Sequence, residues 1–164
     1  MASRWATVWG LDTNMEFREH LVKMVAYEEH ANGLWLTYLD SAVNRPNGGQ
    51  LKAEADKWMW HIWGCYRSWY DWMTDSPTEA QPDVRISLAE QYARMKPFIE
   101  TCDLDEVRSR THPDYGTWTW ITRDVIHHTL LHGSYHRGHI RAIAEAHGFD
   151  DFPDTDWEEF TGYQ

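Results

Sequence analysis

Apolar residues recur at helical spacing along four long segments of the chain, and this pattern constrains the fold more than any other feature. Within each segment they return every three or four residues, as on one face of an amphipathic helix. The segments cover residues 15–43, 51–73, 84–98 and 123–147. A polar loop at residues 44–49 and Pro77 separate the first three segments, and Pro97 is expected to kink or end the third. Helices of this length with apolar stripes predict an all-α four-helix bundle.

The connection before the fourth helix is long and mixed in composition. Residues 113–116 read Pro-Asp-Tyr-Gly, a turn sequence, and the Thr-Trp-Thr-Trp run that follows favours a short extended segment. A connection of this length leaves the topology of the bundle open. The tail, residues 151–164, is expected to form one short helix. The length of 164 residues fits a single domain over 1–164 with a sizeable core.

Composition and charge argue against several classes of protein. The net charge of −11 disfavours nucleic acid, because phosphate recognition needs concentrated Lys and Arg, and it disfavours an anionic membrane surface. No stretch approaches the roughly 20 apolar residues of a membrane-spanning helix, and the first residues lack the apolar run of a signal peptide. Cys65 and Cys102 make no disulfide framework and suit a reducing compartment. We therefore expect a cytoplasmic protein.

Histidine is concentrated in the fourth segment. The chain has ten His, and five of them lie from residue 127 to residue 139. His128 and His132 are four residues apart, as are His132 and His136, so each pair lies on one helix face with Cβ atoms about 5–6 Å apart. His136 and His139, three apart, also qualify. Spacing alone predicts a helical cluster that can hold a metal ion, and it leaves the ligand pair open.

A third ligand has to come from another helix, and His61 is the best placed candidate. It follows Trp58 by three residues and precedes Cys65 by four, on the apolar face of the second segment. Three imidazoles leave a coordination position open, as in catalytic sites, and they suit Zn, Ni, Fe or Cu. Cys65 can add a thiolate ligand, although a small buried apolar role is favoured for it. An isolated His pair is more often incidental, but this clustering favours a divalent metal.

Two charged residues near these histidines each allow two interpretations. Glu28 lies on the apolar stripe of the first segment, where it is expected to sit at the edge of the stripe and reach water. The alternative is a buried carboxylate near a functional site. Arg137 directly follows His136. It can contact an anionic substrate or a thiolate, or it can form a surface or interhelix salt bridge.

The segment His132-Gly-Ser-Tyr-His136-Arg137-Gly138-His139-Ile140 resembles the H-x-x-x-H-R-G-Q-I signature of the DinB family, a superfamily of metal-binding four-helix bundles. The sequence around His61, Trp-His-Ile followed by aromatic residues, resembles that family's first metal His. Residues 24–32 resemble its first-helix pattern, an aromatic residue followed shortly by Ala-Asn. The likeness covers residues 17–152, and its most specific element is H-x-x-x-H-R-G.

This resemblance implies a four-helix bundle of DinB type with His61, His132 and His136 as metal ligands. It also implies a homodimer. Characterised members include thiol-dependent S-transferases and a maleylpyruvate isomerase, which use low-molecular-weight thiols such as bacillithiol or mycothiol. Many members have no assigned activity. His139 stands where the family usually has Gln, which makes it a candidate extra ligand or proton carrier.

Three functional hypotheses follow. In the first, a divalent metal (Zn, Ni or Fe) and a low-molecular-weight thiol serve a transferase that acts on small electrophiles, with Arg137 and His139 as candidates for anion contact and proton transfer. In the second, the protein is a non-catalytic metal-binding stress-response protein whose ion is structural. The third, least favoured, is a metal-free module that binds a small aromatic ligand.

Overall fold

The computed structural model describes residues 13–114 and 116–162, and within them the chain is mostly helical. The elements in chain order are α1 (Thr13–Ala42), α2 (Gly48–Thr74), α3 (Val84–Thr101), β1 (Val107–His112), β2 (Gly116–Ile121), α4 (Thr122–Ala146) and α5 (Trp157–Thr161). The predicted all-α class is confirmed in its main part. The one small sheet of the described residues lies in the long connection before α4, and the short helix expected in the tail is present as α5.

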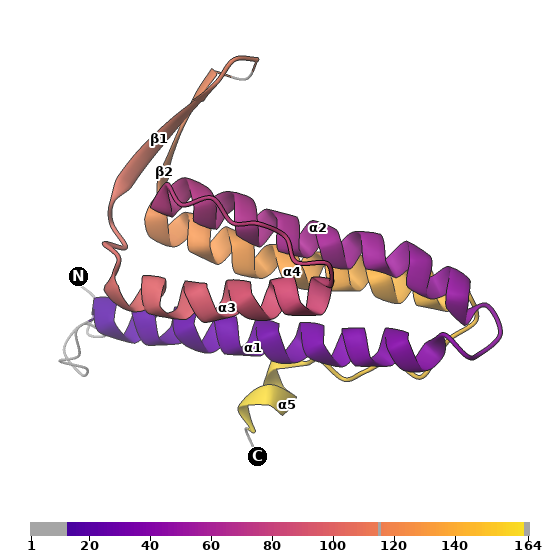
Figure 1. Ribbon diagram of the computed structural model, residues 1–164. Coiled ribbons are helices and arrows are strands. Elements are labelled where there is room, and N and C mark those ends of the chain that lie inside the picture. The colour runs from indigo at the N-terminus through magenta and orange to yellow at the C-terminus, as the bar shows by residue number, and fades with distance from the viewer. Residues whose placement is uncertain (1–12, 115, 163–164) are drawn as a thin grey trace, which may run out of the picture.

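The four long helices lie side by side, with α2 and α4 as one pair and α1 and α3 as the other (Figure 1). Each of them contacts at least two others, because α1 also packs on α2 and α4, and α2 on α3. The shared core receives apolar side chains at helical spacing from every long helix, which removes their stripes from water. Its members include Leu21, Val25, Met59, Ile62, Leu88, Met95, Ile126 and Leu130.

Two residues allow the tight turn between α1 and α2. Asn47 has a φ of 63°, in the left-handed region that Asn adopts more readily than most residues. A Cβ at Gly48 would collide with the carbonyl oxygen of Ala42, so the close approach of the backbones requires glycine. The N–H of Leu51 donates to the carbonyl oxygen of Asn47 at 3.0 Å. As a result α2 begins at Gly48, inside the segment expected to be a loop.

Helix α3 continues through the proline that was expected to kink or end it. Pro97 lies inside the helix, which extends to Thr101. Proline removes one N–H donor, but the next turn is intact, since the N–H of Cys102 donates to the carbonyl oxygen of Phe98 at 2.8 Å. Ile99 in that turn is fully buried in the core. Of the two predicted effects of Pro97, the end of the helix is therefore wrong, and the buried last turn explains why the helix continues.

The long connection before α4 is a hairpin that projects from one end of the helices (Figure 1). Strands β1 and β2 pair antiparallel, with hydroxyl pairs at 2.9 Å between Ser109 and Thr119 and between Thr111 and Thr117. At its base the N–H of Thr122 donates to the carbonyl oxygen of residue 106 at 2.9 Å. The end of β2 therefore leads directly into α4 and fixes where that helix starts.

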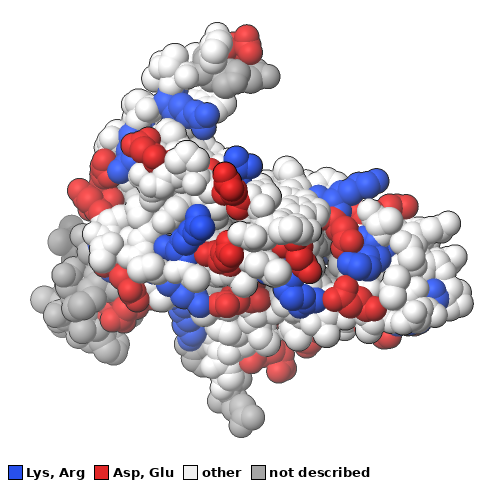
Figure 2. All heavy atoms as spheres, viewed as in Figure 1, with Lys and Arg blue, Asp and Glu red and all other residues white. Residues whose placement is uncertain are grey.

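Charges of both signs intersperse on the face shown in Figure 2. Ion pairs between Arg85 and Asp40 and between Lys96 and Glu29 link α3 to α1. Among the helices of the described residues, none combines the length and the apolar composition needed to cross a bilayer.

Candidate metal centre

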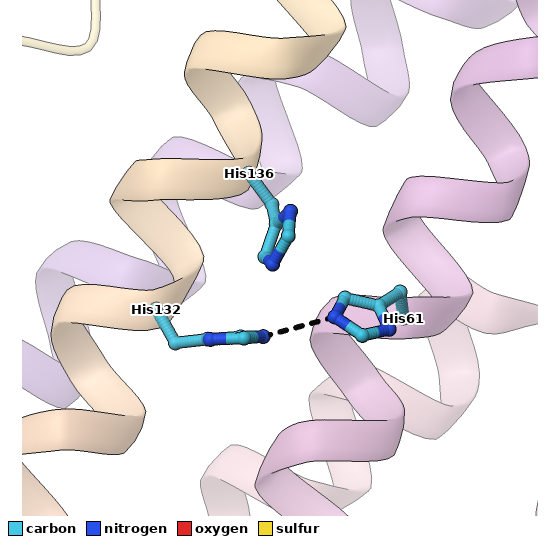
Figure 3. A group of neighbouring side chains, drawn as sticks. All are labelled: His61, His132 and His136. Carbon is cyan, nitrogen blue, oxygen red and sulfur yellow. Dashed lines mark hydrogen bonds between the residues drawn. The ribbon is translucent and has the colours of Figure 1, made fainter.

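Three predicted ligands from two helices converge on one point between α2 and α4. His61 comes from α2, and His132 and His136 lie one turn apart on α4, with all three rings turned toward the same space (Figure 3). The Nε2 atoms of His61 and His132 are 3.1 Å apart, and one nitrogen from each of the three rings lies within 4.8 Å of the others. We call these residues the three-histidine cluster.

The spacing of these nitrogens suits a metal ion. Ligands about 2.0–2.1 Å from a tetrahedral ion lie about 3.3 Å from one another. The 3.1 Å separation of the two Nε2 atoms is close to that distance, and no two of the three ligand nitrogens are more than 4.8 Å apart. The donor set therefore fits a divalent ion held by three protein ligands.

Burial differs across the three-histidine cluster. His136 is only 5 % exposed, and its Nδ1 is buried without a hydrogen-bond partner among the described residues. His132 is half-buried and His61 is exposed. Buried polar atoms are nearly always paired, so the Nδ1 of His136 is an exception and is available to a ligand. The exposed side of the cluster, at His61, is where a further ligand can enter from solvent.

The environment keeps two of these rings neutral. Burial, together with the neighbouring His132, His61 and His139, lowers the pKa of His136 to about 4. Burial and the neighbouring His61 and His128 also lower the pKa of His132 below its ordinary value. Neutral imidazole is the form that coordinates a metal. At neutral pH both residues on α4 therefore present a free lone pair.

His139, a predicted catalytic candidate, lies beside the three-histidine cluster. Its ring stacks on Trp58, with centroids 4.9 Å apart and planes 6° from parallel. The ring of His136 also stacks on Trp58, with centroids 4.8 Å apart, and lies 5.5 Å from the ring of His139. Tyr135, which is 65 % exposed, packs at 4.9 Å against both imidazoles. Trp58 and Tyr135 therefore fix the ring of His136 and give the site an aromatic border.

Arg137, the second catalytic candidate, is buried in an ion pair with Glu28. Its Nη1 and Nη2 donate to the two carboxylate oxygens of Glu28, each at 2.6 Å. Arg137 is 4 % exposed and Glu28 1 %. The expectation that Glu28 reaches water is therefore wrong, because a guanidinium from α4 and the hydroxyl of Tyr66, at 3.0 Å, pair with the carboxylate inside the core. Of the two interpretations of Arg137, the structure contains the interhelix salt bridge.

A polar network surrounds this ion pair and ties α4 to α1. Ser134 donates to Glu28 at 3.2 Å, and Arg137 donates to Asn32 at 3.1 Å. We call Glu28, Asn32, Tyr66, Ser134 and Arg137 the Glu28 network. It clamps the stretch of α4 that carries two of the three imidazoles, and sequence reasoning missed it as a unit. The available signal was an acidic residue on an apolar stripe together with an Arg next to a candidate ligand.

Gly133 makes room for this network. A Cβ at that position would collide with the Oε2 atom of Glu28, which Arg137 and Tyr66 hold in place. The glycine between the two ligand-bearing turns of α4 is thus required by the close approach of the Glu28 carboxylate, and its backbone has no positive φ.

Cys65 and His128, both left open as further ligands, lie one turn away from the three-histidine cluster. Among the described residues they do not join it but form a separate group with His132. Burial raises the pKa of the Cys65 thiol to about 12, so the free thiol is protonated at neutral pH.

Comparison of the chain with known proteins gave no match to a family model, to a curated protein or to a solved structure. The likeness to the DinB family stays a resemblance of sequence motifs, and the function has to be inferred from the site.

Proposed function

We propose that this chain is a DinB-like four-helix bundle protein that binds one divalent metal ion through His61, His132 and His136. The observation that carries the proposal is the convergence of three ligand nitrogens, from two helices, within 4.8 Å of one another. The Nδ1 of His136 supports it, because this buried ring nitrogen has no hydrogen-bond partner among the described residues and is free to take a ligand.

The proposed activity is a metal-dependent transfer of a low-molecular-weight thiol to a small electrophile. A divalent ion held by three protein ligands has an open position, where it lowers the pKa of a thiol or of water. In the reaction the sulfur forms a bond to the electrophilic carbon, the leaving group departs with the bonding electrons, and the thiol proton goes to solvent. The exposed side of the cluster at His61 is the entry for both reactants.

The residues around the cluster have distinct roles in this proposal. Trp58 and Tyr135 orient His136 and offer flat apolar surfaces to a substrate. His139, held against Trp58, is the candidate for proton transfer. Arg137 acts through the Glu28 network as a positioning residue that fixes α4, in place of the anion contact first considered. The homodimer implied by the resemblance is part of the same proposal.

A second candidate function is a non-catalytic protein with a structural ion. It is favoured by the nearness of His139, whose ring centroid lies 5.5 Å from that of His136, because a fourth protein ligand would close the coordination shell. In this case the ion raises stability but has no exchangeable fourth ligand. The two kinds of site are separated by adding a thiol to a Co²⁺-loaded sample. A change in the absorption of the cobalt shows that the thiol binds the metal and that the site is open, whereas no change indicates a closed site.

The first experiment is elemental analysis of freshly purified, untagged protein. We expect one divalent ion per chain in the wild type and a strong loss in His132→Ala, which removes the one donor that the three-histidine cluster shares with the neighbouring Cys65 and His128 group. His127→Ala is the matched control, since His127 is an exposed α4 residue outside both candidate ligand groups. Metal-free wild-type protein that also fails to take up Zn²⁺, Ni²⁺ or Fe²⁺ would overturn the proposal.

Activity is tested on the metal-loaded protein with bacillithiol, mycothiol and glutathione against a chloronitrobenzene. Turnover that depends on the metal and is lost in His61→Ala supports the transferase. Tight metal binding without turnover with any of the three thiols favours the structural ion.

A further inference from the structure

A second group of metal-binding side chains lies next to the three-histidine cluster. Cys65 is one helical turn after His61 on α2, and His128 is one turn before His132 on α4. The Sγ atom of Cys65 and one ring nitrogen each from His128 and His132 all lie within 4.8 Å of one another. We call these three residues the Cys65 cluster.

The facing surfaces of α2 and α4 explain why there are two groups. One turn forward on α2 corresponds to one turn back on α4, so the two helices run antiparallel along this face. Donors at spacing four on both helices therefore form a ladder, with His61 opposite His132 and His136, and Cys65 opposite His128 and His132. The ring centroids of His128 and His132 are 5.7 Å apart, and those of His132 and His136 are 4.3 Å apart.

The accessibility of the Cys65 cluster suits a site that exchanges with solvent. Cys65 and His132 are half-buried and His128 is exposed. Trp69 packs against His128, with ring centroids 5.9 Å apart, and gives that side of the cluster an apolar wall. One nitrogen from each of two imidazoles on the neighbouring helix lies within 4.8 Å of the sulfur, so the thiol has two candidate co-ligands beside it.

The donor chemistry differs between the two groups. Three imidazoles suit borderline ions such as Zn²⁺, Ni²⁺ and Fe²⁺, whereas a thiolate shifts preference toward softer, thiophilic ions. When a thiol becomes a ligand, its proton is released to solvent as the metal–sulfur bond forms. A neutral imidazole offers one lone pair, so His132 can serve only one ion at a time.

We propose that Cys65, His128 and His132 form a second, thiolate-containing metal position that takes Zn²⁺ or another thiophilic divalent ion, and that it alternates with the three-histidine position through the shared ring of His132. This inference does not rest on the proposed function, because each position has two ligands of its own. His61 and His136 belong to one position, and Cys65 and His128 to the other.

The test uses full-length protein and Co²⁺ as the probe, because a cobalt–thiolate bond adds a charge-transfer absorption in the near ultraviolet that imidazole ligands do not give. The variant His61→Ala/His136→Ala leaves the Cys65 cluster complete. We expect it to bind one Co²⁺ with this absorption. Adding Cys65→Ala is expected to remove the absorption and to weaken binding by more than about a hundredfold, since changes outside the ligand shell alone weaken binding about 10–100-fold.

A folded His61→Ala/His136→Ala variant, verified by circular dichroism, that binds no Co²⁺ or binds it without the sulfur absorption would overturn the proposal. Because His136 is buried, this variant can fail to fold. In that case His61→Ala alone, compared with His61→Ala/Cys65→Ala, is decisive, since His61 is exposed and the absorption reports on Cys65 alone.

The reciprocal variant, Cys65→Ala/His128→Ala, separates this inference from the proposed function. It leaves the three-histidine cluster intact and is expected to bind one Co²⁺ without the sulfur absorption. If only this variant binds Co²⁺, the proposed function stands and the second position is wrong. If only His61→Ala/His136→Ala binds Co²⁺, the second position stands and the three-histidine site of the proposed function is wrong. Wild-type protein is expected to saturate at one Co²⁺ per chain, and two tightly bound ions would overturn the alternation.

Discussion

The two sides of one stretch of α4 differ in whether their polar side chains are paired within the protein. On the side facing α1, Arg137 and Ser134 belong to the Glu28 network, where carboxylate, guanidinium and hydroxyl groups pair with one another. On the side facing α2, His132 and His136 converge with His61, and the buried Nδ1 of His136 has no partner among the described residues. The first side is paired within the chain, whereas the second leaves a buried ring nitrogen open to a ligand.

The largest effect is expected from breaking the paired side. Arg137→Met leaves the Glu28 carboxylate buried without its cation, and should lower the free energy of unfolding by about 3–5 kcal/mol, measured by urea denaturation. The matched variant Glu28→Leu/Arg137→Met removes both charges and should recover most of that loss. A cost below about 1 kcal/mol for Arg137→Met would mean that the pair is not the clamp described here.

The next effect tests the unpaired side. An ion that binds only the folded chain stabilises it by about 2.7 kcal/mol at a free concentration of 100 times its dissociation constant. Zn²⁺ should raise the melting temperature of the wild type but not that of His132→Ala, which removes the ring shared by both candidate positions. Glu28→Leu/Arg137→Met should keep the response. An equal response of His132→Ala would show that Zn²⁺ binds elsewhere.

A smaller effect is expected at Gly133, which lies between the two ligand residues of α4 and against the Glu28 carboxylate. In Gly133→Ala the new methyl group displaces the Glu28 carboxylate, and the broken hydrogen bonds cost about 1–3 kcal/mol. Alanine is the better helix former by up to about 1 kcal/mol, so the net change should be destabilising. Gly138→Ala, on the same helix with open space around the added Cβ, should be neutral or stabilising in the same thermal melt.

The smallest effect concerns a paired carboxylate at the surface. Burial alone would raise the pKa of Asp40, but hydrogen bonds from Lys52 and Arg85 lower it below its ordinary value. A lowered pKa adds stability above the unfolded value of about 3.9, and this contribution disappears as pH falls through the folded pKa. Because these groups are exposed, Asp40→Asn should cost less than about 1 kcal/mol at neutral pH, and the difference from wild type should vanish in acid.

Much of the fold could be predicted from local pattern. Apolar spacing predicted the four long helices, and the turn sequence with the Thr-Trp run located β2, whereas the strand β1 was not predicted. The ends of the helices were harder to predict, because contacts between residues distant in sequence determine where a helix begins and ends. Gly48 starts α2 through its fit against Ala42, and Ile99 holds the end of α3 in the core past Pro97.

The candidate site was only partly accessible to the same reasoning. Spacing placed His132 and His136 on one helix face, and position on an apolar stripe selected His61. Spacing could not place the partner of Glu28, since Arg137 lies 109 residues away in sequence. Nor could it divide the donors into two groups, because that depends on how α2 and α4 are aligned along their shared face.

The separation of His61 from His132 along the chain has a kinetic consequence. The two residues are 71 positions apart, with α3 and the hairpin between them, so neither donor group exists until α2 and α4 have docked. An ion that needs both helices cannot bind before they have docked, so we expect it to leave the folding rate nearly unchanged. It should instead slow the opening of the native protein, so that metal protects the chain mainly by extending the lifetime of its folded state.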